Sequence, residues 1–389
     1  MMQMSASRLV LPSIKILFQN KVEEHMATYL DDYVININDD IYYAHWKLHK
    51  NKCILIVNND EGTMEGILTI SDLNRTYADD SLKNVRDICN RNCKYLINDE
   101  HTYDKARSLF SELSYINHIP VVDENKKLVD IISRQQAFWK QYFVEEKLPR
   151  MHYAYCIYMA ALEAKTLGYR KISIIEFGVA GGQGLMNCEF HSKAVSRLLD
   201  IEIEIYGFDL GNGLPSENHG YMDMIHLFRS GDYKMDYDKL MNKLEFSKLV
   251  LGNLKDTTKT FLDKYSPAPI GAMLVDVDYY SSSLPILEFL KNSDEYFLPR
   301  IYMYWDDISP EYEFQGESAA ICDFNRNNEF IKISPEKEYY QNYRQKTKIC
   351  HKFTHPKYNE PSDVYVGKGS LRHDKPFFFH ELPLTAKQI

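Results

Sequence analysis

The second half of the chain alternates between strand-length apolar runs and helical segments, and two of the runs end in acids. The run 272–275 leads into the segment 276–278 (Asp-Val-Asp), and the run 301–305 leads into the pair 306–307 (Asp-Asp). In an open α/β sheet, the carboxyl ends of the strands line the ligand crevice. Four carboxylates at that edge repel one another unless a cation or protonation relieves the repulsion. The pattern therefore predicts a metal-assisted site at one edge of a sheet.

The periodicity of the apolar residues predicts the elements of this sheet. Expected strands cover residues 171–177, 201–208, 249–251, 272–275 and 301–305, and expected helices cover 151–167, 185–199 and 284–290. Strands that alternate with helices favour an α/β fold with a Rossmann-like, doubly wound, mostly parallel sheet. Because the residues before this region follow a different pattern, the 389-residue chain is divided into a domain at 1–145 and a second at 146–389.

The first domain contains an internal repeat. Residues 54–73 and 119–133 each predict a strand, a polar hairpin turn, a second strand and the start of a helix, and a helix-like segment precedes each copy at 41–50 and 102–113. Over about residues 30–140 this order resembles a tandem pair of CBS domains, the α+β modules that sense adenosine ligands. The resemblance implies a regulatory module and a possible homo-oligomer.

A short signature sets the expectation for a nucleotide in this module. In the CBS family, a Ser/Thr-x-x-Asp signature after the last strand contacts the ribose of the ligand. Thr69 and Asp72 fit this signature, whereas the second copy has Ser133 and, in place of the aspartate, Gln136. The resemblance therefore implies at most one adenine-nucleotide site, at Thr69 and Asp72. A purely structural or dimerising pair is the alternative.

A glycine-rich loop follows the first strand of the second domain. The segment 176–184 reads Glu-Phe-Gly-Val-Ala-Gly-Gly-Gln-Gly, and its glycines allow tight turns and a close approach of the backbone to a ligand. The helix that follows has unpaired backbone N–H groups at its N-terminus. The spacing is not the dinucleotide fingerprint G-x-G-x-x-G. It is similar to the loop of class I methyltransferases, which use S-adenosylmethionine (AdoMet) and place an acid, here Glu176, before the glycines.

Asp209 ends the second strand of the domain. An acid at this position is placed to accept hydrogen bonds from two ribose hydroxyls, in NAD enzymes as well as AdoMet enzymes. Asp209 therefore supports an adenosine cofactor but does not distinguish NAD from AdoMet. The structural alternative is that Asp209 caps a helix or lies in a solvated turn. The next residues, Gly211-Asn212-Gly213-Leu214-Pro215, narrow the choice.

Five collinear segments over about residues 150–330 resemble the macrocin O-methyltransferase family, which methylates sugar hydroxyls. They are Gly207-Phe208-Asp209 with Gly213-Leu214-Pro215, Gly252 to Thr257, Asp276 to Ser283, Trp305-Asp306-Asp307, and Gly316 to Ala320. The resemblance implies a cofactor site for AdoMet. Its residues are Glu176, Gly178, Gly181, Gly184, Asp209 and Asp256.

The same resemblance divides the acids into roles. Asp276, Asp306 and Asp307 are implied to hold a divalent cation, Mg²⁺, and Asp278 to be the catalytic base that takes the hydroxyl proton. Magnesium prefers oxygen ligands and keeps positions open for water or substrate. A carboxylate is a weak base for an alcohol, so the cation is expected to supply much of the activation. Single helix caps at each acid are the structural alternative.

Composition limits the remaining classes of function. The net charge is −9 and no run of basic residues suggests a nucleic-acid partner. No signal-peptide pattern or membrane-spanning apolar stretch is present in the sequence, so no membrane partner is expected. Seven scattered cysteines without secretory features predict reduced thiols and a cytoplasmic protein.

The leading hypothesis from sequence is an AdoMet-dependent, Mg²⁺-assisted O-methyltransferase acting on a sugar or glycan hydroxyl, behind a CBS pair. One alternative is a non-catalytic sensor of adenine nucleotides that serves assembly. The other is a metal-dependent enzyme that acts on phosphate, against which the missing P-loop counts. The sequence matches no trusted motif over residues 334–389, where extra strands or a substrate cover are expected.

Overall fold

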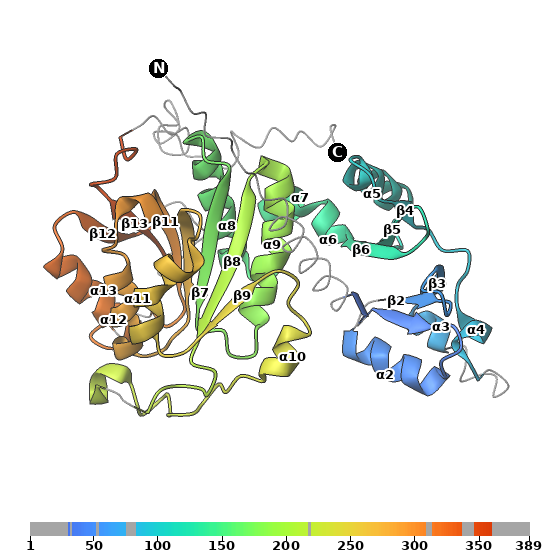
Figure 1. The fold of residues 1–389 in the computed structure, drawn as a ribbon, viewed down its shortest axis with the longest axis horizontal. Helices are drawn as coiled ribbons and strands as arrows, with labels where there is room; N and C mark the ends of the chain where they lie inside the picture. The colour runs from blue at the N-terminus through green and yellow to red at the C-terminus, as the bar shows by residue number, and fades with distance from the viewer. Residues whose placement is uncertain are drawn as a thin grey trace, which may run out of the picture. The chain divides into compact units, whose positions relative to one another are not determined.

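The computed structural model divides into two compact units between Ala137 and Phe138 (Figure 1). It describes residues 30–31, 33–51, 54–74, 83–216, 219–308, 313–336 and 346–359. The N-terminal segment 1–18 and the sequence after 359 lie outside these residues. The sequence-based boundary at 145 falls eight residues later than this division, just after helix α7.

The N-terminal unit repeats one order of elements, as the sequence predicts. The first copy is β1 (Val34–Asn36), α2 (Ile41–Asn51), β2 (Leu55–Asn58), β3 (Met64–Leu68) and α3 (Ile70–Asn74); after α4 (Val85–Ile88), the second is β4 (Leu96–Ile97), α5 (Thr102–Glu112), β5 (His118–Val122), β6 (Leu128–Ser133) and α6 (Arg134–Ala137). In each copy the first strand runs parallel to the second, and the third runs antiparallel to it. The internal repeat is therefore confirmed.

The two copies pack against each other within this unit. Ile54, Ile56 and Met64 of the first copy form one buried cluster with Val122 of the second. The backbone N–H of Met64 also donates to the carbonyl of Lys126 at 2.9 Å. The two copies therefore share one buried apolar cluster, in addition to a larger cluster that the first copy forms with α4.

The C-terminal unit contains a seven-stranded sheet with the order β12-β13-β11-β10-β7-β8-β9. Its strands are β7 (Lys171–Phe177), β8 (Glu202–Asp209), β9 (Lys248–Leu251), β10 (Ile270–Val275), β11 (Phe297–Trp305), β12 (Ile331–Pro335) and β13 (Thr347–Lys352). The first five are parallel to one another, and β13 runs antiparallel to both β11 and β12. Successive strands therefore depart from β7 in opposite directions, which makes the end of β7 a topological switch point.

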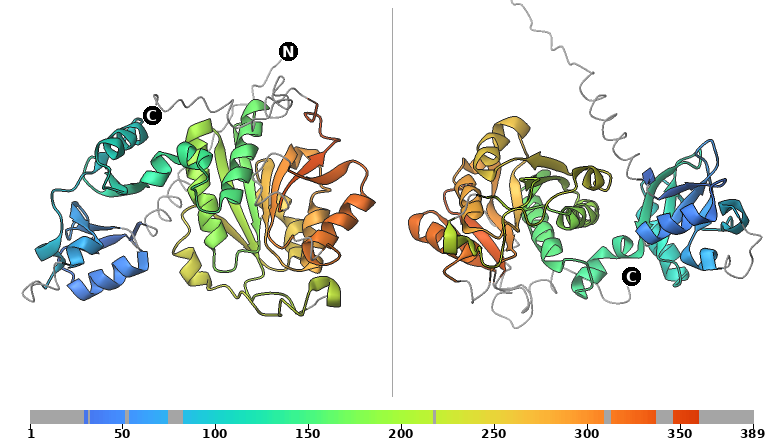
Figure 2. Two further views of the ribbon diagram at one scale, coloured as in Figure 1. Left: turned by 180° about the vertical axis from the view of Figure 1, so that it is seen from behind. Right: turned by 90° about the horizontal axis from the view of Figure 1, so that it is seen from below.

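Helices cover both faces of the sheet, as Figures 1 and 2 show. They are α7 (Trp139–Val144), α8 (Met151–Thr166), α9 (Gln183–Leu199), α10 (Tyr237–Met241), α11 (Leu254–Tyr265), α12 (Tyr280–Phe289) and α13 (Gly316–Asn327), with short 3₁₀ turns η2 (Gly220–Asp223) and η3 (Asp294–Tyr296). Helices α8 and α9 pack on one face, and α11, α12 and α13 on the other.

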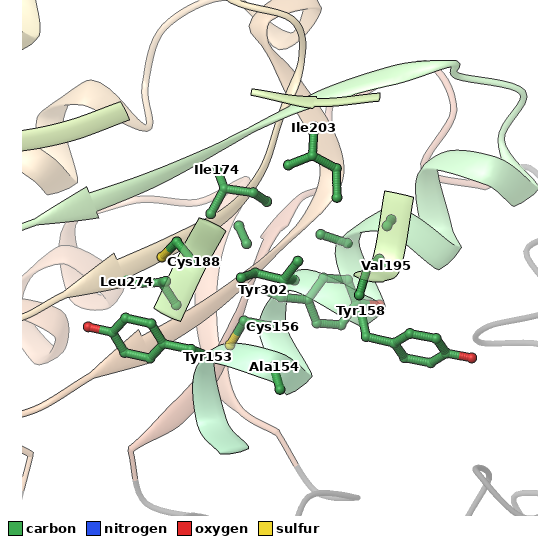
Figure 3. Packing of buried hydrophobic residues seen from close by; sticks show 14 of the residues in the cluster. Tyr153, Ala154, Cys156, Tyr158, Ile174, Cys188, Val195, Ile203, Leu274 and Tyr302 are labelled. Atoms are coloured by element: carbon green, nitrogen blue, oxygen red, sulfur yellow. The ribbon is translucent and has the colours of Figure 1, made fainter. Parts of the chain in front are cut away.

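Alternation along the strands produces these two cores. Ile174 and Leu274 pack with α8 and α9, whereas their neighbours Ile175 and Met273 belong to the core on the opposite face. Figure 3 shows the first of these cores, in which Cys188 of α9 lies near Leu274. Strands buried on both faces explain the almost continuous apolar runs in the sequence.

Extra strands or a substrate cover were expected after residue 334. The structure shows strands there, because the end of β12 and the whole of β13 belong to the sheet. Strand β11 begins at Phe297, earlier than the predicted 301, because Arg300 in its first half finds a buried partner. The Arg300 guanidinium donates to the Glu163 carboxylate at 3.2 Å, and the Tyr302 hydroxyl donates to the same group at 3.0 Å. A buried charge of this kind is not visible in the apolar pattern.

The cysteines of the described residues are free thiols, in agreement with the sequence-based expectation. Cys156, Cys188 and Cys350 are buried, and Cys89 and Cys93 are half-buried. Cys53 lies outside the described residues. No helix within the described ranges is long and apolar enough to cross a membrane.

Candidate active site

The carboxyl ends of the parallel strands meet at one edge of the sheet. Phe177 is paired in register with Phe208 on one side and with Val275 on the other, and Val275 is also paired with Trp305. The loops that follow these four strands therefore emerge side by side. They carry the glycine loop, Asp209 and both acidic segments predicted from the sequence.

A cavity of about 440 Å³ opens at this edge. The glycine loop, the end of β8, the start of α11, both acidic segments, residues 213–215, Phe228 and Tyr233 all contribute to its wall. Its lining includes Arg150, Gly178, Gly181, Gly184, Asp209, Leu214, Phe228, Tyr233, Asn253, Lys255, Asp276, Asp278, Asp306 and Asp307. Eight of the twelve predicted site residues line this cavity, and the other four are Glu176, Asp256, Thr69 and Asp72.

Backbone geometry at the glycine loop requires glycine. Gly178 has φ +86°, and a Cβ at this position would lie 1.8 Å from the carbonyl oxygen of Asp276. The loop therefore passes directly against the first acidic segment. At Gly184, in the first turn of α9, a Cβ would lie 1.6 Å from Oε1 of Glu176. These contacts exclude a side chain at Gly178 and Gly184, whereas a Cβ at Gly181 would meet open space.

Asp209 anchors the glycine loop. Its Oδ2 accepts the backbone N–H groups of Val179 and Ala180, both at 2.9 Å, and its Oδ1 accepts the N–H of Gly211 at 2.5 Å. The carboxylate also lines the cavity. Because three N–H groups occupy it, the carboxylate retains less accepting capacity for ribose hydroxyls than the sequence alone implies.

Glu176 lies beneath the loop. The Tyr153 hydroxyl donates to its Oε1 at 2.8 Å, whereas its buried Oε2 has no hydrogen-bond partner. Burial raises the pKa of Glu176 to about 8, and the charge of Asp276 acts in the same direction. The side chain does not line the cavity, so its contact with any cofactor would be through the loop.

Three carboxylates form a compact cluster across the two acidic segments. Asp276, Asp278 and Asp307 each have a carboxylate oxygen within 4.8 Å of the others. Asp278 is buried and has φ +58°, and the Tyr279 N–H donates to the Val277 carbonyl across it at 2.6 Å. This tight turn, which is rare for a residue other than glycine, directs Asp278 toward Asp307.

Burial and mutual repulsion raise the pKa values of the cluster. The pKa of Asp276 rises to about 7, because the carboxyl is buried and Asp306 and Asp307 repel its charge. Burial and the charge of Asp307 raise the pKa of Asp278 to about 9, and burial raises that of Asp307. Three such groups share protons near neutral pH unless a cation neutralises them.

The cluster fits a hard divalent cation. Oδ2 of Asp307 is buried and has no hydrogen-bond partner, which is costly for a carboxylate unless something else binds it. Carboxylate oxygens are the ligands that Mg²⁺ prefers. Asp276, Asp278 and Asp307 thus offer the kind of oxygen donors that such a cation takes.

Asp306 lies apart from the cluster. It continues the alternation of β11 on the side of Tyr304, whose hydroxyl donates to it. The Lys346 ammonium is 3.6 Å away, and the Asp306 side chain is 40% exposed. The sequence-based assignment gave the cation to Asp276, Asp306 and Asp307; the structure instead brings Asp278 to Asp276 and Asp307.

Glu317 is a site residue to which sequence reasoning gave no role. Its Oε1 accepts the backbone N–H of Val277 at 3.2 Å, and its Oε2 accepts that of Asp307 at 3.0 Å. The side chain is fully buried in α13, and burial raises its pKa well above the usual range. One carboxyl group thus ties the two acidic segments together. The Gly-Glu-Ser segment at 316–318 was the available signal.

Residues 211–216 and 219–236 line one part of the cavity and are hydrogen-bonded to α12. Asp223 accepts the N–H and the hydroxyl of Ser281, both at 2.7 Å. Tyr233 lines the cavity, and burial and the charge of Asp278 raise the pKa of its phenol. An aromatic residue of this segment therefore lies near the carboxylate cluster.

Asp256 is, besides Glu176, the second predicted cofactor residue that does not line the cavity. Asp256 is exposed in the first turn of α11, whereas Gly252 to Lys255, just before it, line the cavity.

In the N-terminal unit, Oδ2 of Asp72 accepts the N–H and hydroxyl of Thr69 at 2.8 and 2.7 Å. The second copy has the same arrangement, because Gln136 accepts the N–H of Ser133 at 2.8 Å. Both pairs are helix-capping boxes.

Comparison with known proteins identifies part of the N-terminal unit. Residues 85–138 match the CBS domain family, so this segment is a CBS domain. No curated protein matches the chain.

Several solved CBS structures are similar to a part of the chain. The CBS domain pair of protein MJ0100, in complex with 5′-methylthioadenosine and AdoMet, is 24% identical and covers 29% of this chain and 88% of its own, with a TM-score of 0.25. CBSX2 in complex with AMP is 21% identical, with the same shares and a TM-score of 0.26. A putative signal-transduction protein with CBS domains from Burkholderia ambifaria is 23% identical and covers 30% of this chain and 87% of its own, with a TM-score of 0.25.

Proposed function

We propose that the C-terminal unit is an AdoMet-dependent, Mg²⁺-assisted O-methyltransferase that acts on a hydroxyl of a sugar or glycan. The observation that carries this proposal is one cavity shared by the glycine loop, Asp209 and the carboxylate cluster. A cofactor site and a cation site that open into the same space suit a transfer between two bound molecules. The order of the strands supports the proposal too, since the cavity lies at the topological switch point beside β7, where open α/β sheets bind ligands.

The glycine loop, Asp209 and the residues before Asp256 would hold the cofactor. Bound AdoMet supplies an activated methyl group on a sulfonium. The chain's own task is then to position a hydroxyl in line with that group and to exclude water, which is where the cavity-lining segment with Phe228 and Tyr233 contributes.

Asp276 and Asp307 would hold the cation, together with Asp278 or Asp306. Bound Mg²⁺ lowers the pKa of a coordinated hydroxyl. Asp278, buried at the centre of the cluster, is placed to accept the hydroxyl proton at its carboxylate. Its pKa, raised to about 9 without a cation, falls when a cation offsets the charges of its neighbours.

The proposal is tested with the full-length chain. Calorimetric titration with AdoMet is expected to show binding, and methyl transfer to a panel of sugar acceptors is expected to disappear on addition of a chelator and to return with Mg²⁺. An alanine variant of exposed Asp256 is expected to retain both. Absence of AdoMet binding would refute the proposal, whereas chelator-insensitive transfer would remove only the cation.

We propose further that the CBS pair binds an adenosine ligand at Thr69 and Asp72. The matched capping boxes allow a controlled test. Asp72→Ala and Gln136→Ala each remove one helix cap, with an expected cost of about 1 kcal/mol. Only Asp72→Ala is expected to reduce AMP binding by about tenfold or more, because only this box carries the carboxylate for a ribose. Titration with AMP measures this; equal AMP affinity in the two variants would make both boxes purely structural.

A further inference from the structure

Arg150 and Lys255 are the two cationic residues in the cavity wall, and Arg150 is the one that lies near the acidic segments. It directly precedes α8 in a left-handed conformation, with φ 40°. Its guanidinium lies over the Tyr153 ring, 5.0 Å from the ring centroid. Arg150 lines the cavity together with Gln183 and Gly184, the first residues of α9. Stacking on an aromatic ring holds a guanidinium plane in place while leaving its N–H groups available.

Apart from the Tyr153 ring, the Arg150 side chain has no hydrogen bond or ion pair with the residues that the structure describes. Glu176, Asp276 and Asp306 are close enough to act on its charge, yet none of them forms an ion pair with it. Its five N–H donors are therefore not used by the described protein. A half-buried guanidinium without a partner is a binding group for an anion.

The position of Arg150 in the cavity indicates which end of a bound cofactor would lie beside it. Asp209 and Gly252 to Lys255 follow β8 and β9, on one side of the switch point. Arg150 lies on the other side, because the acids near it lie near the end of β7 and just after β10 and β11. A cofactor whose ribose lies at Asp209 thus extends its far end toward Arg150. The first turn of α9, with its unpaired N–H groups, favours an anion at the same place.

We propose that Arg150 binds the α-carboxylate of the methionine moiety of AdoMet, together with the first turn of α9. This inference rests on the proposed function. A planar guanidinium pairs with a carboxylate through two parallel hydrogen bonds, so it fixes the orientation of the amino-acid tail as well as its charge. Arg150 is then a cofactor-binding residue that positions the sulfonium beside the carboxylate cluster. The alternative is that Arg150 binds an anionic group of the acceptor sugar.

The test compares two ligands that differ in the amino-acid tail. S-adenosylhomocysteine carries the carboxylate, and 5′-methylthioadenosine lacks it. Calorimetric titration of the full-length chain is expected to show that Arg150→Leu weakens binding of S-adenosylhomocysteine by about 10- to 100-fold and leaves 5′-methylthioadenosine unchanged. Arg150→Lys, which keeps the charge without the planar fork, is expected to give an intermediate loss. Any binding of these ligands to the CBS unit is expected to be the same in wild type and variants, because Arg150 lies in the other unit.

Lys346→Met is the matched control, because it removes a positive charge that also lies beside Asp306. It is expected to leave the ratio of the two affinities unchanged. An equal loss for both ligands in Arg150→Leu, or no loss for either, would overturn the assignment, as would a loss confined to the KM of an anionic acceptor. If wild-type protein binds neither ligand outside the CBS unit, the proposed function fails instead.

Discussion

Asp278→Asn is expected to lower methyl transfer by about 10²- to 10⁴-fold, the usual contribution of a general base. Asparagine keeps the size of the side chain and its ability to adopt φ +58°, so the fold is expected to persist. Because Asp278 lies with Asp276 and Asp307, the variant is also expected to weaken Mg²⁺ binding. Initial rates and calorimetric titration with Mg²⁺ measure the two effects separately.

Asp306→Asn is the informative partner of this variant. Asp306 is turned toward Tyr304 and Lys346, so its replacement is expected to leave most of the Mg²⁺ affinity intact. The sequence-based division of roles predicts the reverse, with Asp306 as a ligand and Asp278 unnecessary for the cation. If Asp306→Asn loses Mg²⁺ affinity and Asp278→Asn retains it, the sequence-based roles are correct and the roles inferred from the structure are wrong.

The sequence predicted the sheet well because its strands are buried on both faces. Such strands are nearly continuous apolar runs, and their ends coincide with the acids and glycines that a crevice requires. The order of elements in the CBS repeat was predictable for a similar reason, since each hairpin has polar residues between two apolar runs. The start of β11 was missed because Pro299 and Arg300 resemble a strand boundary, and only the buried Glu163 explains why the strand extends across them.

The roles of the site residues were less accessible to sequence reasoning. Asp306 and Asp307 are adjacent in sequence, but the alternation of β11 sends them in different directions. The left-handed turn at Asp278 is likewise invisible, because aspartate gives no warning of positive φ as glycine does. Asp209 was expected at a ribose, whereas three backbone N–H groups also bind it. In each case the deciding contact joins residues that are distant in sequence or depends on a single backbone angle.

Glu317 shows how the fold links the two acidic segments. Its two carboxylate oxygens accept N–H groups from residues that follow different strands, β10 and β11. Asp276 and Asp278 belong to the segment after β10, and Asp307 belongs to the segment after β11. If the two segments moved apart, the distances between these three carboxylates would change. Hydrogen bonds that orient cation ligands in this way commonly contribute as much to affinity as the geometry of the ligands themselves.

Glu317→Gln is therefore expected to weaken Mg²⁺ binding and methyl transfer by about 10- to 100-fold, the usual effect of losing a group that orients cation ligands. Glutamine has nearly the same shape, but its amide nitrogen donates, so one of the two backbone N–H groups loses its acceptor. Burying that N–H unpaired is expected to lower the free energy of unfolding by about 1–3 kcal/mol. Titration with Mg²⁺ and urea-induced unfolding measure the two quantities.

Ser318→Ala is the matched control, because Ser318 is the next residue of α13 and its buried hydroxyl has no hydrogen-bond partner. Its removal is expected to change neither Mg²⁺ affinity nor turnover. A positioning role predicts that Glu317→Gln raises the Mg²⁺ concentration needed for half-maximal rate and that excess Mg²⁺ restores part of the turnover. If Glu317→Gln only destabilises the fold, with Mg²⁺ affinity equal to that of Ser318→Ala, the carboxyl group supports α13 and not the cation site.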